Sequence, residues 1–192
     1  MVKGFEDTLR ILSESLKTVD ENMFKKLLDR CCLSLSEGKK VVVSGLGKNV
    51  PICEKFVGTM NSLGMDAVFL NTNSAVHGDM GIVKQEDVVI ILTKSGETAE
   101  SVYLAQLLKY RKVYMWLLSF ERNSTLAEII PDKLILDLEH EGDMWNIMPN
   151  NSTTLNLIIL QNLAMRIAEE RKISLEVFKS NHPGGHIGKL LS

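Results

Sequence analysis

The sequence has little of several features that mark specialised protein classes. Among its 192 residues there are three cysteines, four prolines and 6% aromatic residues. Cys31 and Cys32 are adjacent, Cys53 stands alone, and no CxxC spacing occurs, which argues against a disulfide framework or a zinc site. We therefore expect reduced thiols in a reducing compartment.

The sequence also lacks a large excess of charge of one sign and long apolar runs. Lys and Arg number 22 against 24 Asp and Glu, a net charge of -2, which argues against a nucleic-acid surface. No apolar run approaches a membrane span, and residues 1–10 carry four charges where a signal peptide would be apolar. We expect a cytoplasmic protein that binds neither nucleic acid nor membrane.

With 45% apolar and 24% charged residues, the composition is that of an ordinary globular protein. A chain of this length can bury an adequate core without a disulfide or metal. We expect one domain over residues 1–192, with an N-terminal helix in 1–37 and an α/β core in 38–192.

The N-terminal helix is predicted from apolar residues at steps of three or four between Phe5 and Cys31. Such spacing gives a narrow apolar stripe that needs a partner. Two interpretations stay open: the stripe packs on its own domain, or it pairs with a second subunit.

Beyond residue 38, short β-branched runs alternate with helical spacing. Strands are predicted at 40–44, 67–70, 88–93, 113–118 and 133–138. Helices are predicted at 50–63, 98–110 and 124–130, followed by a largely buried final helix at 153–171. Strand and helix in alternation predict an α/β protein with a doubly wound parallel sheet.

Ligands of such sheets bind beyond the carboxyl ends of the strands, so the turns there are the places to search. The first, residues 44–49, contains Gly45 and Gly47, which permit close backbone approach, followed by Lys48. Neither the dinucleotide fingerprint nor the phosphate-loop pattern is complete. The turn is therefore either a ligand contact or only a tight connection to the next helix.

The turn at residues 93–98 has a stronger composition for binding. Ser95, Gly96 and Thr98 bring hydroxyls and exposed backbone N–H groups to a helix N-terminus, which suits a phosphate. The alternative is that Ser95 or Thr98 only caps the helix. If phosphate binds, the Glu100 carboxylate has to point elsewhere.

Three further segments are polar without an evident structural need. They are residues 74–81 with His77, residues 139–143 followed by Ser152 and Thr153, and residues 181–186, which are too rich in glycine and proline to be helical. Each segment also has an interpretation without function. In that interpretation His77 is only a hydrogen-bonded structural group, residues 139–143 are a solvated loop, Ser152 and Thr153 are a helix cap, and residues 181–186 are a chain end.

Taken together, and in their order along the chain, these segments resemble the motifs of one family. The chain resembles a sugar isomerase (SIS) domain over about residues 35–191, and within that superfamily the arabinose-5-phosphate isomerases. The resemblance rests on the segments 45–48, 77–81, 95–100, 149 with 152–154, and 182–185. It implies a three-layer sandwich with a five-stranded parallel sheet flanked by helices, flavodoxin-like in winding. It also implies a homo-oligomer, a dimer or tetramer, with sites built partly from neighbouring subunits.

The resemblance also assigns residues. It places catalytic groups on Lys48, Glu100, Glu141 and His182. It places contacts to a phosphosugar on Ser44, Gly45, Gly47, Asn49, His77, Ser95, Gly96, Thr98, Ser152 and Thr153. The sequence departs from the family pattern at Asn49 and Val50, which replace Ser and Gly, and at Ser74, which replaces Glu. The pair of CBS domains found in many members is expected to be absent.

The reaction implied is aldose–ketose isomerisation through an enediol, which requires no metal or cofactor. Glu141 is the preferred base, with a pKa raised by partial burial, and Glu100 is the alternative. His182 would open the ring and Lys48 would stabilise the enediolate. A non-catalytic phosphosugar sensor is the main rival, although residues before 39 contain no DNA-binding pattern; a nucleotide enzyme is a weaker one.

Overall fold

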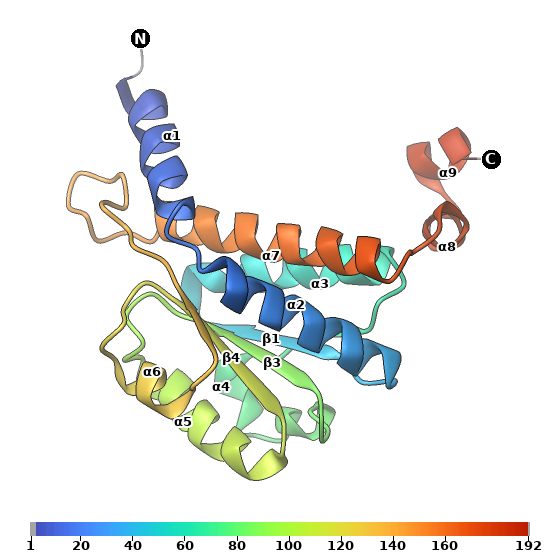
Figure 1. Ribbon diagram of the computed structural model, residues 1–192, viewed down its shortest axis with the longest axis horizontal. Coiled ribbons are helices and arrows are strands. Elements are labelled where there is room, and N and C mark those ends of the chain that lie inside the picture. Colours follow the sequence, from blue (N-terminus) through green and yellow to red (C-terminus); the bar gives the residue numbers. More distant parts are fainter. Residues whose placement is uncertain (1–2, 192) are drawn as a thin grey trace.

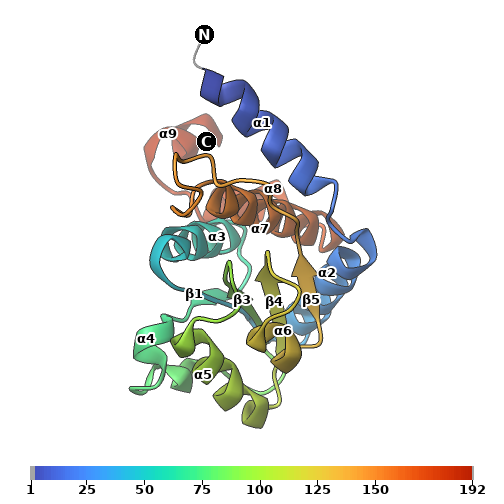
Figure 2. The ribbon, with the colours of Figure 1, turned by 90° about the vertical axis from the view of Figure 1, so that its left-hand side faces the viewer.

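The structure, a computed structural model, describes residues 3–191. A five-stranded, all-parallel sheet lies between two layers of helices (Figures 1 and 2). The sheet order is β2-β1-β3-β4-β5, which is a doubly wound order, so the predicted fold class is confirmed. The strands are β1 (Val41–Gly45), β2 (Ala67–Phe69), β3 (Val88–Leu92), β4 (Tyr114–Ser119) and β5 (Lys133–Ile135).

The central strands read as unbroken apolar runs because helices cover both of their faces. Alternate residues of β1 enter different cores: Val41 and Val43 join one cluster and Val42 the other. The side chains of β3 divide in the same way. These two buried faces fix the sheet and leave its carboxyl edge free to carry turns.

One helical layer contains α1 (Lys3–Leu16), α2 (Glu21–Ser36), α3 (Val50–Ser62) and α7 (Asn151–Glu170). The other contains α4 (Thr72–Ala75), α5 (Ala99–Leu108) and α6 (Thr125–Ile129). The short 3-10 helices are η1 (Gly47–Asn49), η2 (Asp79–Ile82) and η3 (Lys109–Arg111). Two last helices, α8 (Leu175–Ser180) and α9 (Gly185–Leu191), form an arm beyond the end of α7 (Figure 1).

The expectation of a single N-terminal helix is wrong, because residues 17–20 separate α1 from α2. The Asp20 carboxylate accepts the N–H groups of Asn22 and Met23 and so caps a new helix. The apolar stripe is divided accordingly. Its second part is buried in the domain's own core, whereas Phe5 and Leu9 on α1 are 72% and 68% exposed.

The C-terminal segment also differs from expectation. Ser174 caps α8 by accepting the Val177 N–H, and α9 begins at Gly185, inside the segment predicted to lack helix. Residues 181–184 are not helical, as predicted.

The three cysteines are unpaired, and burial raises the pKa of Cys53 to about 12. Among residues 3–191 no helix combines the length and apolarity that a bilayer crossing requires.

Candidate active site

The chain turns in opposite directions from β1 and β3, which lie side by side in the sheet. From β1 it continues to the edge strand β2, and from β3 it continues to β4 and β5. A crevice forms at such a switch point, outside the carboxyl ends of the strands. The turns that follow Gly45 and Leu92 are therefore neighbours, and both were singled out from the sequence.

The turn after β3 is shaped by Gly96. Its φ of +70° lies in the left-handed region, and an added Cβ would lie 2.1 Å from the Ser124 Oγ. The Gly96 N–H donates to the Thr93 Oγ1 at 3.1 Å, and the Gly96 carbonyl accepts the Leu126 N–H. These contacts hold the turn against the start of α6.

Donors for an anion remain open in this turn. Thr98 occupies the N-cap position of α5, but its side chain makes no capping hydrogen bond. Ser95 is exposed, and its hydroxyl accepts the Glu97 N–H at 3.3 Å. Hydroxyls and N–H groups at the start of a ten-residue helix are the arrangement that binds phosphate.

The two glutamates of this segment point away from such a ligand or into solvent. The Glu97 carboxylate accepts the N–H and hydroxyl of Thr125 at the start of α6, and these bonds lower the pKa of Glu97. Glu100 is exposed in the first turn of α5. Glu97 therefore acts as a cap for α6.

Glu141 is fully buried, and each of its carboxylate oxygens faces a donor. Oε2 accepts the N–H groups of Asn150 and Ser152, both at 2.9 Å. Oε1 lies 2.8 Å from the Lys94 Nζ. Burial alone would raise the pKa of Glu141, but Lys94 and these N–H groups outweigh it and lower the pKa. This corrects the expected rise, which considered burial without the donors.

The loop around Glu141 is held by its own hydrogen bonds. The Glu141 N–H donates to the Asn146 side chain, and its carbonyl accepts from Asn150 and Asn151. Ser152 and Thr153 lie directly beyond, in the first turn of α7, where the Thr153 hydroxyl donates to the Asn150 carbonyl. The structure thus brings together the predicted residues Glu141, Ser152 and Thr153.

The turn after β1 approaches from the other side. Gly45 has no room for a Cβ, which would lie 2.8 Å from the Asn49 Cβ, and Gly47 has a φ of +56°. The Asn49 Oδ1 accepts from the Asn156 side chain of α7, so this turn contacts the same helix as Glu141. Lys48 is exposed on η1.

Ser44 is placed differently from our expectation of a ligand contact. Its side chain is buried, and its hydroxyl bonds the Leu70 carbonyl at 2.7 Å and the Thr72 hydroxyl at 2.8 Å. The hydroxyl joins β1 to the segment after β2. His77 is exposed in the turn after α4, and within residues 3–191 no hydrogen bond links its ring to the crevice.

His182 lies far from the other predicted groups of the same chain. Its Nδ1 is 2.7 Å from the Phe178 carbonyl, and the centroids of the His182 and Phe178 rings are 4.1 Å apart. Asn181 donates to the Ser62 carbonyl, at the end of α3 remote from Asn49. The twenty residues of α7, about 30 Å of helix, separate Glu141 from this arm, as Figure 1 shows.

Lys94, which pairs with Glu141, was not assigned a role from the sequence. Lys94 and Phe120 line a cleft of about 260 Å³ together with Ser95, Glu121, Leu138 and Asn146. A lysine within a serine- and glycine-rich turn was a visible signal for an anion contact. Its pairing with Glu141 was not visible, because the two are far apart in the sequence.

Comparisons with known proteins identify the family of the chain. A family model described as SIS domain matches residues 34–166. The arabinose 5-phosphate isomerase KdsD of Pseudomonas aeruginosa is 35% identical over 163 residues, which are 84% of this chain and 50% of that protein. An Escherichia coli CFT073 protein solved in complex with arabinose 5-phosphate is 29% identical, with a TM-score of 0.85 and 94% of each chain covered.

A third likeness, to the Vibrio vulnificus NanR protein complexed with ManNAc-6P, has 14% identity, a TM-score of 0.71 and coverage of 93% of this chain and 64% of that one. At that identity it shows the fold alone. The chain spans about half the length of the curated relatives it matches. On the family match and the relatives together, the chain belongs to the SIS domain family.

Proposed function

We propose that the chain is an aldose–ketose isomerase acting on a sugar phosphate, with arabinose 5-phosphate and ribulose 5-phosphate as the first pair to test. One observation supports this above all: an open anion-binding turn lies beside a buried carboxylate. Lys94 belongs to that turn and pairs with the Glu141 carboxylate at 2.8 Å. A phosphate held at Ser95 and Thr98 would keep the sugar carbons close to a base.

The roles proposed for the residues come from the family resemblance, and the positions of the residues are compatible with them. Glu141 removes the proton from C2 of the aldose, leaving the electron pair in an enediolate. The hydroxyl proton of O2 moves to O1, and Glu141 returns its proton to C1 to give the ketose. Lys48, exposed on η1, stabilises the negative oxygen. Glu100 is the alternative base, since it is exposed at the start of α5.

His182 requires a second copy of the chain in this proposal. Its own chain holds it at the far ends of α3 and α7, so it can open a sugar ring only at the site of a neighbour. A homo-oligomer, dimer or tetramer, is therefore part of the proposed function. The family likeness to KdsD and to a protein solved with arabinose 5-phosphate supports the substrate class.

The rival function is a phosphosugar sensor without turnover. The bonding of Glu141 favours it, because a carboxylate with three donors and a lowered pKa is a weak base. Binding of a phosphate would need only the turn at residues 93–98.

One experiment separates the two functions. The pure protein is incubated in deuterated water with a panel of pentose and hexose phosphates, and aldose–ketose conversion is followed by NMR. We expect conversion of at least one phosphosugar and of no free sugar. Binding of phosphosugars without conversion of any of them would establish the sensor and refute the isomerase.

A further inference from the structure

Lys94 has a fixed backbone and a side chain that lines the cleft beside the turn at residues 93–98. The Lys94 carbonyl accepts the Ser119 hydroxyl at 3.1 Å and the Phe120 N–H at 3.3 Å. The side chain is 41% exposed, whereas Glu141 at its tip is 0% exposed. Lys94 is therefore the partly exposed member of this pair, and Glu141 is the buried one.

The two oxygens of Glu141 depend on Lys94 to different degrees. Oε2 has two backbone N–H groups that cannot move away without unfolding the start of α7. Oε1 is buried and accepts no well-directed hydrogen bond from residues 3–191, so the nearby Lys94 charge is its compensation. If Lys94 turned away, Oε1 would be the oxygen left free to take a proton.

Other charged groups near Glu141 already have partners of their own. Across the cleft, Glu121 accepts the Asn123 N–H. On the same loop, the His140 Nδ1 accepts the Gly142 N–H, and the Asp143 carboxylate accepts three N–H groups of residues 145–148. Glu139 is paired with Arg10 of α1. Of the charges that face Glu141 within residues 3–191, Lys94 is thus the one that a ligand in the cleft can draw away.

We propose that Lys94 is shared between two anions: the Glu141 carboxylate when the site is empty, and the phosphate of the bound sugar when it is occupied. The inference rests on the proposed function and adds to it a residue that couples phosphate binding to the base. Lysine suits this task because its ammonium is a point charge on a flexible stem.

The consequence is a base that becomes strong only in the complex. A buried carboxylate that loses its cation favours the protonated form. Glu141 can then accept the C2 proton on Oε1 and release it to C1, and no other reactant is consumed. In the empty site the ion pair keeps the buried charge compensated. Lys94 is here a positioning and phosphate-binding residue.

A binding experiment tests the coupling without any turnover. The Glu141 carboxyl carbon, identified by its loss in Glu141→Gln, is titrated with acid by NMR, with and without saturating inorganic phosphate. We expect phosphate to raise the pKa of Glu141 strongly in the wild type and much less in Lys94→Met. Phosphate itself should bind Lys94→Met at least tenfold more weakly.

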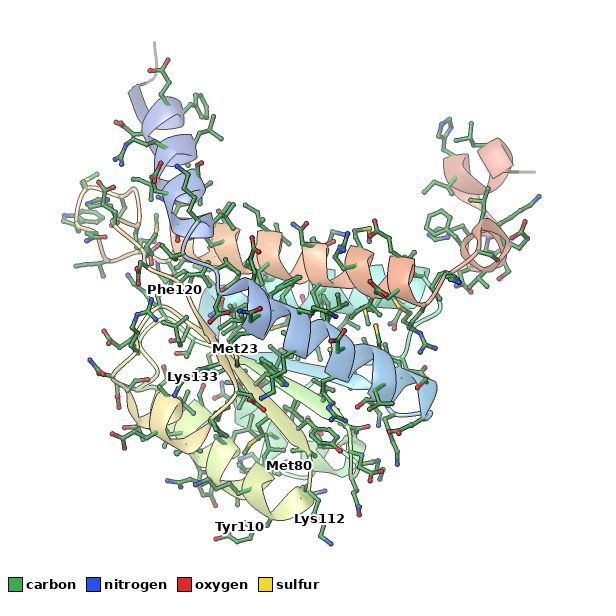
Figure 3. The ribbon with its side chains drawn as sticks, in the orientation of Figure 1. Met23, Met80, Tyr110, Lys112, Phe120 and Lys133 are labelled. Carbon is green, nitrogen blue, oxygen red and sulfur yellow. The ribbon has the colours of Figure 1, made fainter. Side chains whose placement is uncertain are left out.

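Lys112→Met is the matched control, because Lys112 is exposed at the opposite end of the sheet from Phe120, as Figure 3 shows. It should behave as the wild type does. If Lys94→Met does not fold, Lys94→Gln takes its place. An equal rise of the pKa in the wild type and in the Lys94 variant would overturn the proposal, as would a wild type in which bound phosphate leaves the pKa unchanged or in which no phosphate binds.

A kinetic experiment separates this role from a merely structural one. The pH profile of kcat/KM reports the free protein and that of kcat reports the complex. In Lys94→Met we expect the acid limb of kcat/KM to move to higher pH, the acid limb of kcat to stay in place, and KM to rise at least tenfold. A structural role would move both limbs together and overturn the proposal. Absence of turnover in the wild type would refute the isomerase alone, and the NMR titration would still decide the coupling.

Discussion

The loop of Glu141 and the arm of His182 carry two of the proposed catalytic groups, but they are built in contrasting ways. Glu141 is buried, and its donors come from the turn after β3 and the start of α7 in its own chain. His182 contacts its own helix α8, on an arm whose Leu175 and Leu190 are 61% and 73% exposed. The surroundings of Glu141 are complete within one chain. His182, by contrast, lies far from the other proposed catalytic groups of its own chain.

On the proposed function, this difference means that a single chain holds only part of the site. The groups at the sheet edge are held by local hydrogen bonds and by the two cores, so they keep their geometry in isolation. The arm is held mainly at the end of α3, through Asn181 and the contact of Val177 with Gly64. In the proposed oligomer, a second copy would cover the exposed apolar residues of the arm, and His182 would act at the sheet edge of that copy.

The largest effect on turnover is expected from a change of Glu141, the proposed base. Glu141→Gln keeps the shape of the side chain but cannot accept a proton at neutral pH. Exchange of the C2 proton with deuterated water, followed by NMR with arabinose 5-phosphate, should fall by about 10² to 10⁴ while binding survives. Exchange that continues unaltered in this variant would move the base to Glu100.

The proposed phosphate-binding turn should not accommodate a larger residue than glycine at position 96. In Gly96→Ala the new Cβ would overlap Ser124 in a left-handed backbone, and we expect a loss of about 2 to 5 kcal/mol in the free energy of unfolding. Gly58→Ala is the control, since its Cβ meets no atom within 4 Å in the middle of α3, and it should gain about 0.4 to 1 kcal/mol. Urea unfolding of both variants measures the difference. Equal stabilities would show that the turn adapts.

A smaller effect is expected from the hydroxyls of the same turn. Removing both in Ser95→Ala with Thr98→Ala should weaken phosphosugar binding at least tenfold, because charge-assisted hydrogen bonds are each worth about 1.5 to 3 kcal/mol. Calorimetry of the double variant measures the affinity. Binding equal to that of the wild type would place the phosphate elsewhere.

The smallest effect concerns acid stability. The pKa of Glu141 is lowered by Lys94 and two N–H groups, so its contribution to stability is present above the unfolded pKa of about 4.3 and is lost as pH falls through the folded value. Urea unfolding between pH 7 and pH 3 should show a shallower acid loss in Glu141→Gln. Glu100→Gln, a change at an exposed position, should keep the wild-type slope, and identical slopes in all three proteins would contradict this assignment.

The sheet and the turn after β3 could be predicted from the sequence because their signals are local. Apolar runs indicated the strands, and the glycine and hydroxyl residues at 93–98 indicated the turn. The break between α1 and α2 was missed although Asp20 is a capping residue, because the apolar spacing continues across it. The lowered pKa of Glu141 and the distance of His182 could not be predicted, since both depend on which segments the tertiary fold places together.

The most direct test of a site shared between chains is complementation by two inactive variants. Glu141→Gln and His182→Asn are co-expressed with different tags, and the mixed oligomer is purified through both tags, with light scattering to establish its size. If His182 serves a neighbour's site, a mixed dimer contains one intact site of two and should regain about half of the wild-type turnover. Mixed oligomers that stay as inactive as either variant, or a wild-type protein that is a monomer at micromolar concentration, would contradict the shared site.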